Sequence, residues 1–236
     1  MDQERWKSFD TPPEIEIKPC NNLEDIYLAK SNYYKSPIHY SFLEWIKDQD
    51  SRQNTTPILS QMPGIESGPS EIHLVSLMTS LAHNTFFEAF VLHDLPRKDL
   101  FAPIAMMMRY NNTVTKFIAS KLGNSSKIGE LGQALAHNKD HQLSIFDISY
   151  NNISGSDFFQ IVDCIDNFPH GLSVLNLSCC NLNQKSVIEL FNSFQRNYAM
   201  SLTLEELILD KNKFGDKGEK KNIQKKKKKR KKKLFF

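Results

Sequence analysis

Apolar residues recur at the same five relative positions in three segments of the chain. The middle segment, Leu172–Leu182, has Leu at its first, fourth, sixth and eleventh positions and Cys180 at its ninth. Leu175 and Leu177 lie two residues apart, so both point from one face of a short strand into a core. The other two copies follow the same rule, with Leu143, Phe146, Ile148, Asn151 and Ile153 upstream and Leu204, Leu207, Leu209, Asn212 and Phe214 downstream.

Two weaker copies precede these three, and helical patterns separate all five. The weaker copies keep part of the spacing, with Phe87, Phe90 and Leu92 in the first and Val114, Phe117 and Ala119 in the second. We therefore expect five strands, which start near residues 87, 114, 143, 172 and 204. Apolar residues three and four apart mark one face of a helix before the first strand and between the later ones. These residues are Leu74, Leu77, Met78 and Leu81, then Ile104, Met107 and Met108, then Ile128, Leu131 and Leu135, then Phe158, Ile161, Val162 and Ile165, and finally Val187, Leu190, Phe191 and Phe194.

The expected strand starts are 27, 29, 29 and 32 residues apart. Parallel strands need a crossover of a dozen or more residues, and these intervals provide one with a full helix in each unit. The spacing L-x-x-L-x-L-x-x-[N/C]-x-L with this period is typical of the long class of leucine-rich repeat. The prediction is an α/β leucine-rich-repeat solenoid, a horseshoe with parallel strands on the concave face and helices on the convex face. Its expected parts are a helical lead-in or cap with a loop over residues 1–71, the array over residues 72–218, and a disordered polylysine tail over residues 219–236.

The lead-in shows two further helical stripes. They are Leu23, Ile26 and Tyr27 in the first, and Ile38, Phe42, Trp45 and Ile46 in the second. We expect Trp6 and Trp45 to be buried against the open edge of the array. The Pro- and Gly-containing stretch over residues 51–70 predicts a loop or a degenerate strand.

Polar side chains inside the motif have expected structural roles. The four letters Leu-Ala-His-Asn end a predicted helix at residues 81–84 and again at residues 135–138, which supports internal repetition. Asn151 and Asn212 are expected to bond the backbone of the turns with their amides, a role that Cys180 can only partly fill.

Composition and charge restrict the class of protein. A chain of 236 residues with 40% hydrophobic residues can build a packed core. It has no apolar stretch near the roughly 20 residues that a membrane span needs, and residues 1–10 lack the apolar region of a secretory signal, so a cytoplasmic chain is expected. The last copy ends before the helix that should cover its strand, which predicts either a fragment of a longer array or an unnatural end of the coding sequence.

No catalytic, metal or cofactor motif is present in the sequence. H-E-x-x-H, the P-loop and G-x-G-x-x-G after a strand are all missing. The four Cys residues form no C-x-x-C pair and are expected to be reduced. His83 and His137 recur at helix ends, where favourable dipole contact explains them. We therefore predict a non-enzymatic protein without cofactor, metal or small-molecule substrate.

The segment from Ile128 to Gly218 resembles one family in particular. The residues that carry the resemblance are the run Leu131–Asn138, the approach Phe168-Pro-His-Gly-Leu172, the strand Leu175-Asn-Leu-Ser178, and the lengthened interval Asn197–Leu204. They are similar to the repeat domain of the CARMIL family, which regulates actin capping protein and links myosin-I, and the likeness extends over about residues 72–218. The resemblance implies a cytoplasmic scaffold at the actin cortex with actin-regulatory protein partners. That family has a pleckstrin-like domain before the repeats and a capping-protein-binding segment after them, and neither pattern occurs here. A repeat module of an unrelated pathway is the alternative.

The expected binding surface is the concave face. By strand alternation its central column is Val91, Ile118, Asp147, Asn176 and Ile208, and the next column is His93, Ser120, Ser149, Ser178 and Asp210. We expect a protein partner to bind through Val91, His93, Ile118, Asp147, Tyr150, Asn176, Ile208 and Asp210. The alternative is that these residues are ordinary solvent-facing surface.

The tail supports a second binding hypothesis. Residues 219–236 hold eleven Lys and Arg and one Glu, so the tail carries +10 and the remaining residues together carry −7. The nine successive cations Lys225, Lys226, Lys227, Lys228, Lys229, Arg230, Lys231, Lys232 and Lys233 attract polyanions by charge alone. Weak contact with an anionic membrane is expected before nucleic acid, and a solvated tail without a selected function is the alternative.

Overall fold

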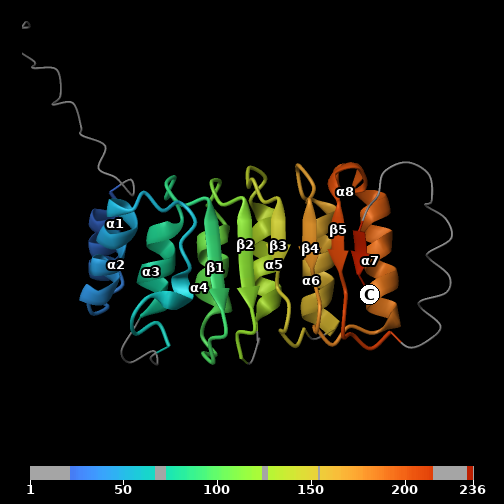
Figure 1. The fold of residues 1–236 in the computed structure, drawn as a ribbon, viewed down its shortest axis with the longest axis horizontal. Coiled ribbons are helices and arrows are strands. Elements are labelled where there is room, and N and C mark those ends of the chain that lie inside the picture. The colour runs from blue at the N-terminus through green and yellow to red at the C-terminus, as the bar shows by residue number, and fades with distance from the viewer. Residues whose placement is uncertain (1–21, 67–72, 124–126, 154, 215–232, 236) are drawn as a thin grey trace, which may run out of the picture.

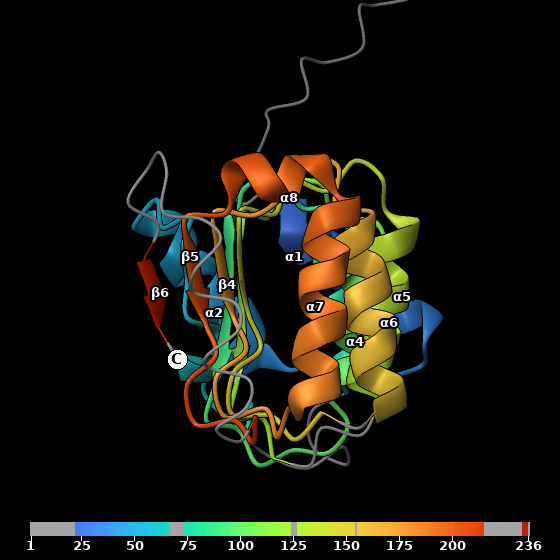
Figure 2. The ribbon, with the colours of Figure 1, turned by 90° about the vertical axis from the view of Figure 1, so that its right-hand side faces the viewer.

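The computed structural model shows a mixed α/β architecture in two layers. Strands form one layer and helices α4 to α7 form the other (Figures 1 and 2). The buried apolar residues of both layers form one core. The described residues are 22–66, 73–123, 127–153, 155–214 and 233–235.

Within these residues, helices and strands alternate from β1 to α7. The helices are α1 (Leu23–Tyr33), α2 (Tyr40–Ser51), α3 (Leu74–Leu81), α4 (Phe101–Met108), α5 (Ile128–His137), α6 (Gly155–Asp166), α7 (Gln184–Arg196) and α8 (Tyr198–Thr203), with a 3₁₀ turn η2 (Leu59–Gln61). The strands are β1 (Ala89–His93), β2 (Lys116–Ser120), β3 (Ile145–Asp147), β4 (Val174–Asn176), β5 (Glu206–Ile208) and β6 (Lys233–Phe235).

The strands form one parallel sheet in chain order. Each strand pairs with the next, from β1 through β6, and a helix lies between each pair from β1 to β5. The expected α/β arrangement with parallel strands is therefore confirmed. The helices α3 to α7 all lie where the apolar spacing predicts them, whereas the short helix α8 in the longest interval was not predicted.

Each hydrogen-bonded strand begins two residues later than the sequence pattern suggests. The first apolar residue of each copy lies in the approach to the strand, where it is buried, as Leu143 and Leu172 show with exposures of 1% and 0%. The spacing of apolar residues indicates which residues are buried, and burial begins two residues before the backbone hydrogen bonds between strands.

Asparagine side chains connect the turns that follow the strands. The amide of Asn151 donates to the carbonyl oxygens of Ala119 at 2.7 Å and Ile148 at 2.9 Å, and its oxygen accepts from the backbone N–H of Leu122 at 3.0 Å. Asn212 makes equivalent bonds two units further on, while in the unit between them the Cys180 thiol reaches the Ile148 carbonyl at 3.3 Å. The predicted structural role of these residues is confirmed.

A second set of asparagines connects the helix ends. The amide of Asn138 donates to the carbonyl oxygens of Met108 and Asn111, each at 2.9 Å, and Asn111 and Asn197 bond their preceding units in the same way. In the unit between those of Asn138 and Asn197, the position that holds asparagine in the other units is occupied by Phe168. There the ring of His141 packs edge-on against Phe168 with centroids 4.7 Å apart.

The core is a continuous apolar layer between the strands and the helices. Phe90, Phe117 and Phe146 stack along neighbouring strands with ring centroids 5.3 and 5.6 Å apart. These residues occupy the same register position, which places identical ring types above one another.

The lead-in packs on the first unit through aromatic rings. Trp45 in α2 is 8% exposed and lies 5.8 Å from the Phe87 ring, as its predicted burial requires. Ile38 does not belong to the second helical stripe, because α2 begins only at Tyr40 and Ile38 is 41% exposed. Trp6 lies outside the described residues.

The segment before η2 behaves as a degenerate strand. The carbonyl oxygen of Thr55 accepts hydrogen bonds from the backbone N–H groups of Glu88 and Ala89, and Ile58 forms a single parallel bridge with Val91. No helix in the described part of the chain is both long and apolar enough to cross a membrane.

Candidate functional site

The residues that alternate with the core positions of β1 to β5 form rows across the sheet. In the central row, Val91 pairs with Ile118, Ile118 with Asp147, Asp147 with Asn176, and Asn176 with Ile208. The sequence-predicted column is therefore one register row. Phe146 and Leu175 beside it point the other way and are fully buried, which fixes the row on the face opposite the helices.

A polar pair lies at the centre of this face. The amide of Asn176 donates to Oδ2 of Asp147 at 2.8 Å, and Oδ1 of Asp147 accepts from the backbone N–H of Ser149 at 2.9 Å. The oxygen of Asn176 accepts from the backbone N–H of Ser178 at 3.0 Å and from its hydroxyl at 2.7 Å. Both side chains are therefore held in one orientation while remaining partly exposed.

Aliphatic side chains surround this polar pair. Ile145 and Val174 form the row two residues earlier in register, and both are half-buried, as are Ile118 and Ile208. The sequence analysis did not identify Ile145 and Val174 as surface residues. They lie two residues before Asp147 and Asn176, so strand alternation places them on the same face. We define the strand-face patch as Ile118, Ile145, Asp147, Val174, Asn176 and Ile208.

An aromatic and charged edge borders the patch. Tyr150 is 46% exposed, and the Lys211 ammonium lies 5.8 Å from its ring centroid. Both residues have left-handed backbones, with φ of 57° each, because the chain turns sharply after each strand. Asp210 is partly exposed, but its Oδ1 atom is buried without a hydrogen-bond partner. His93 is exposed on the same face, at the end of β1.

Two expectations about this face are wrong. Val91 does not project into solvent but is only 9% exposed, because the degenerate strand around Ile58 pairs alongside β1. Ser149 and Ser178 are also buried, at 2% and 6% exposed, because their hydroxyls bond within the face. The accessible surface therefore extends over β2 to β5 rather than from β1.

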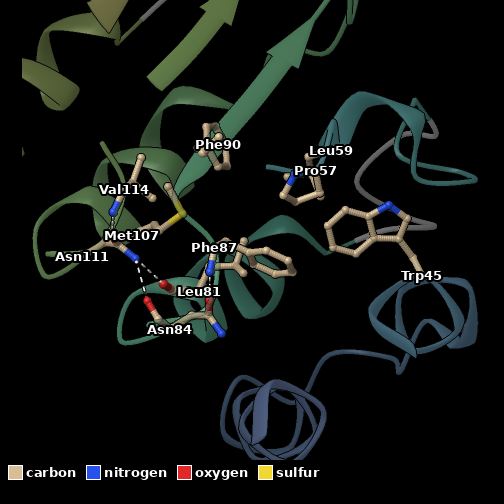
Figure 3. Close-up of a pocket in the computed structure, with 11 residues that line it drawn as sticks. Trp45, Pro57, Leu59, Leu81, Asn84, Phe87, Phe90, Met107, Asn111 and Val114 are labelled. Carbon is tan, nitrogen blue, oxygen red and sulfur yellow. Dashed lines mark hydrogen bonds between the residues drawn. The ribbon is translucent and has the colours of Figure 1, made fainter. Parts of the chain in front are cut away.

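The described residues include one small pocket away from this face. It has a volume of about 20 Å³ and lies where α2 and the degenerate strand meet the first unit (Figure 3). Its lining is Trp45, Pro57, Leu59, Leu81, Asn84, Phe87, Ala89, Phe90, Met107, Asn111 and Val114. Small-molecule sites have volumes of about 300–1,000 Å³, whereas this space suits a single water.

The two buried thiols, Cys164 and Cys180, are poor nucleophiles and poor ligands. Burial raises the pKa of the Cys180 thiol to about 12, and burial also raises the pKa of the Cys164 thiol. The described residues contain no group of three or more His, Cys, Asp or Glu side chains placed to hold a metal ion. Of the proposed polyanion-binding residues, 225–232 lie outside the described residues, and Lys233 begins β6.

Comparison with known proteins gives one distant relative. The chain is 22% identical over 146 residues to a protein named Rho GTPase-activating protein gacW from Dictyostelium discoideum. The match covers 61% of this chain but only 13% of that protein. No protein-family model matches the chain.

Proposed function

We propose that the chain is a leucine-rich-repeat solenoid that acts as a non-enzymatic docking module for a protein partner. The regular spacing of strands and helices and the asparagine bonds between successive units support this architecture. The strand-face patch is the proposed docking surface. One observation carries the proposal: four half-buried aliphatic side chains surround a rigid Asp147–Asn176 pair on the sheet face opposite the helices.

The composition of the patch fits a protein partner better than a small molecule. Aliphatic side chains on a firm sheet supply apolar area with little loss of side-chain entropy, and the central polar pair supplies directional hydrogen bonds. Asp147 already accepts one hydrogen bond at each oxygen, and each carboxylate oxygen has capacity for a second. A partner donor can therefore bind Asp147 without breaking the pair.

We further propose that the partner belongs to the actin cytoskeleton. The support is the resemblance to CARMIL repeats over residues 72–218, which implies capping protein and myosin-I as associated proteins. The relative named as a Rho GTPase-activating protein aligns with this chain over 146 residues at 22% identity, and the aligned part is 13% of that protein. We interpret the shared part as a module that also occurs inside a longer protein.

The experiment measures binding of the purified chain to purified capping protein and to a purified myosin-I tail. The test variant is Ile145→Lys with Val174→Lys, and a second variant carries Asp147→Ala, Tyr150→Ala and Asn176→Ala. The matched control is Phe159→Lys with Ile188→Lys, because these residues are 57% and 48% exposed on the helix layer. Circular dichroism establishes that each variant is folded.

Both strand-face variants should weaken binding at least about tenfold. In the first variant, lysine cannot enter an apolar contact without losing hydration. The second variant removes the polar pair and the Tyr150 ring from the contact. The helix-layer control should bind like the wild type. If neither probe binds the wild type, the actin assignment is wrong. If a probe binds all variants equally, the strand-face patch is not the docking surface.

The non-enzymatic part of the proposal has its own assay. A GTPase-activating protein accelerates GTP hydrolysis by about 10³–10⁵-fold by supplying an arginine to the transition state. We expect this chain to leave single-turnover hydrolysis by a purified Rho-family GTPase unchanged. An acceleration of that size would show that the chain is an activating protein.

A further inference from the structure

A row of aromatic and basic side chains crosses the edge where the helices end. His83 follows α3, Arg109 and Tyr110 follow α4, and His137 ends α5. The His83 and Tyr110 rings lie 5.7 Å apart, the Arg109 guanidinium carbon lies 6.0 Å from the Tyr110 centroid, and Arg109 Nη2 lies 3.3 Å from His137 Nε2. We call these four exposed residues the helix-end row.

Arg109 differs from the other arginines that the structure describes. Arg52 pairs with Asp48 at 2.8 Å, Arg97 with Asp99 at 2.6 Å, and Arg196 with Asp166 at 2.8 Å. Among the described residues, Arg109 alone of the four has no carboxylate within ion-pair distance. A guanidinium keeps its charge at any physiological pH, and among the described residues only the partial charge at the C-terminus of α4 offsets it.

Helix capping does not account for the position of Arg109. The carbonyl oxygens of Met108 and Asn111, at the end of α4 and just after it, already accept hydrogen bonds from the amide of Asn138. The guanidinium instead contacts a Tyr ring and an imidazole nitrogen. These contacts orient the planar group while leaving other N–H donors of its fork available.

We propose that the helix-end row binds an oxyanion, a carboxylate or a phosphate monoester, on a segment of a protein partner. Arg109 supplies the paired N–H donors that such groups accept in parallel. Contacts with Tyr110 and His137 orient the Arg109 guanidinium, and the His83 ring lies beside the Tyr110 ring. The row lies before the strands begin and is separate from the strand-face patch, so this proposal does not depend on the proposed function.

The test follows the histidine ring signals by NMR while peptides are added at low ionic strength. Three peptides differ at one central residue, which is phosphoserine, Glu or Ser. The His83 and His137 signals are assigned with His83→Gln and His137→Gln. Arg109→Ala removes the guanidinium, Arg109→Lys keeps the charge without the fork, and Arg52→Ala is the matched control at another exposed arginine.

The phosphoserine peptide should shift both ring signals, and the Ser peptide should shift neither. A shift with the Glu peptide as well identifies the carboxylate as sufficient, whereas a shift with phosphoserine alone identifies a phosphate. Arg109→Ala should weaken binding by roughly tenfold, Arg109→Lys should bind less tightly than the wild type, and Arg52→Ala should change nothing. The proposal is wrong if no anionic peptide shifts the rings, if Arg109→Ala binds like the wild type, or if Arg109→Lys does.

Discussion

The amide of Asn151 connects two neighbouring units through buried backbone groups. The side chain is fully buried and bonds the backbone groups of Ala119, Ile148 and Leu122. Removing the amide takes this bond from the Ala119 carbonyl and the Leu122 N–H, at a cost of about 1–3 kcal/mol for a fully unsatisfied group, whereas the Ile148 carbonyl still accepts from the Cys180 thiol. This one buried side chain therefore matters more for stability than any single surface contact.

Replacing Asn151 by Ala should lower the free energy of unfolding by about 2–4 kcal/mol. Asn151→Cys should cost less, because the Cys180 thiol bonds the Ile148 carbonyl from the equivalent position. Urea denaturation measures both. Asn152→Ala is the control, since Asn152 is exposed and its side-chain oxygen accepts an exposed hydrogen bond from Asn181. Equal losses for Asn151→Ala and Asn152→Ala would contradict the structural role.

His141 should make folding stability depend on pH. Burial lowers the pKa of His141 from its ordinary value of 6.5 to about 4, with repulsion from His170 and Lys139 as smaller causes. Between these values the unfolded chain binds more protons than the folded one, so stability is complete above 6.5 and falls as the pH drops toward 4. The loss amounts to at most about 3 kcal/mol.

The variant His141→Leu should flatten this pH dependence. Its urea midpoint is compared with the wild-type midpoint at about pH 7 and about pH 4.5. Burial also lowers the pKa of His39, but both proteins keep that residue. The difference between their changes in urea midpoint with pH therefore comes from His141. Identical slopes would show that His141 is not held neutral by the fold.

At the scale of elements, α5 and α6 pack closely because Gly132 has no side chain. A Cβ atom at Gly132 would lie 2.6 Å from the carbonyl oxygen of Gln160 and 3.0 Å from the backbone nitrogen of Ile161. Backbone atoms of a packed helix cannot move aside without displacing the helix. Glycine is a poor helix former, and the close packing of α5 on α6 explains its presence at position 132.

Gly132→Ala should destabilise the chain by about 1–3 kcal/mol despite the better helix propensity of alanine. Gly155→Ala is the matched control in α6, because nothing lies within 4 Å of an added Cβ there. That control should be neutral or slightly stabilising. Thermal unfolding of both variants tests the contrast, and a stabilising Gly132→Ala would refute close packing of α5 on α6.

Periodic elements were predictable from sequence, and aperiodic ones were not. Burial on one face sets the spacing of α3 to α7 and of β1 to β5, so the pattern of apolar residues reports them directly. The burial of Val91 could not be predicted, because it depends on how the aperiodic segment around Ile58 pairs with β1. The short helix α8 has too few residues for a periodic signal.

The candidate site was predictable to a similar extent. Strand alternation identifies the row through Asp147 and Asn176, but it does not reveal that their side chains bond each other. In the helix-end row, the sequence indicates only dipole contact by the two histidines. The distinguishing feature of that row, an arginine without a carboxylate, requires three-dimensional distances.

At the scale of the whole molecule, positive charge is concentrated in residues 219–236. Residues 219–236 carry +10 in a chain whose total is +3. We propose that this segment contacts anionic membranes by charge. Binding to vesicles of mixed neutral and anionic phospholipid should be strong at low salt and vanish near about 1 M salt, where the screening length is only about 3 Å.

The matched comparison for the tail is the same chain ending at Gly218. The shortened chain should not bind the vesicles at any salt concentration. Its affinity for a protein partner should be retained through Ile145, Val174 and the Asp147–Asn176 pair, because these patch residues lie in β3 and β4, away from the strand β6 that the deletion removes. Salt-independent vesicle binding, or equal vesicle binding by both chains, would contradict a charge-driven contact.

The central claim is that a protein docks on the sheet face opposite the helices, and site-specific photo-crosslinking tests it whichever protein the partner is. A photoreactive amino acid replaces Val174 on the strand face or Phe159 on the helix layer, and each protein is irradiated in cytosolic extract. The account predicts a discrete crosslinked partner from position 174 and none from position 159. A partner captured from position 159 but not from position 174 would contradict it.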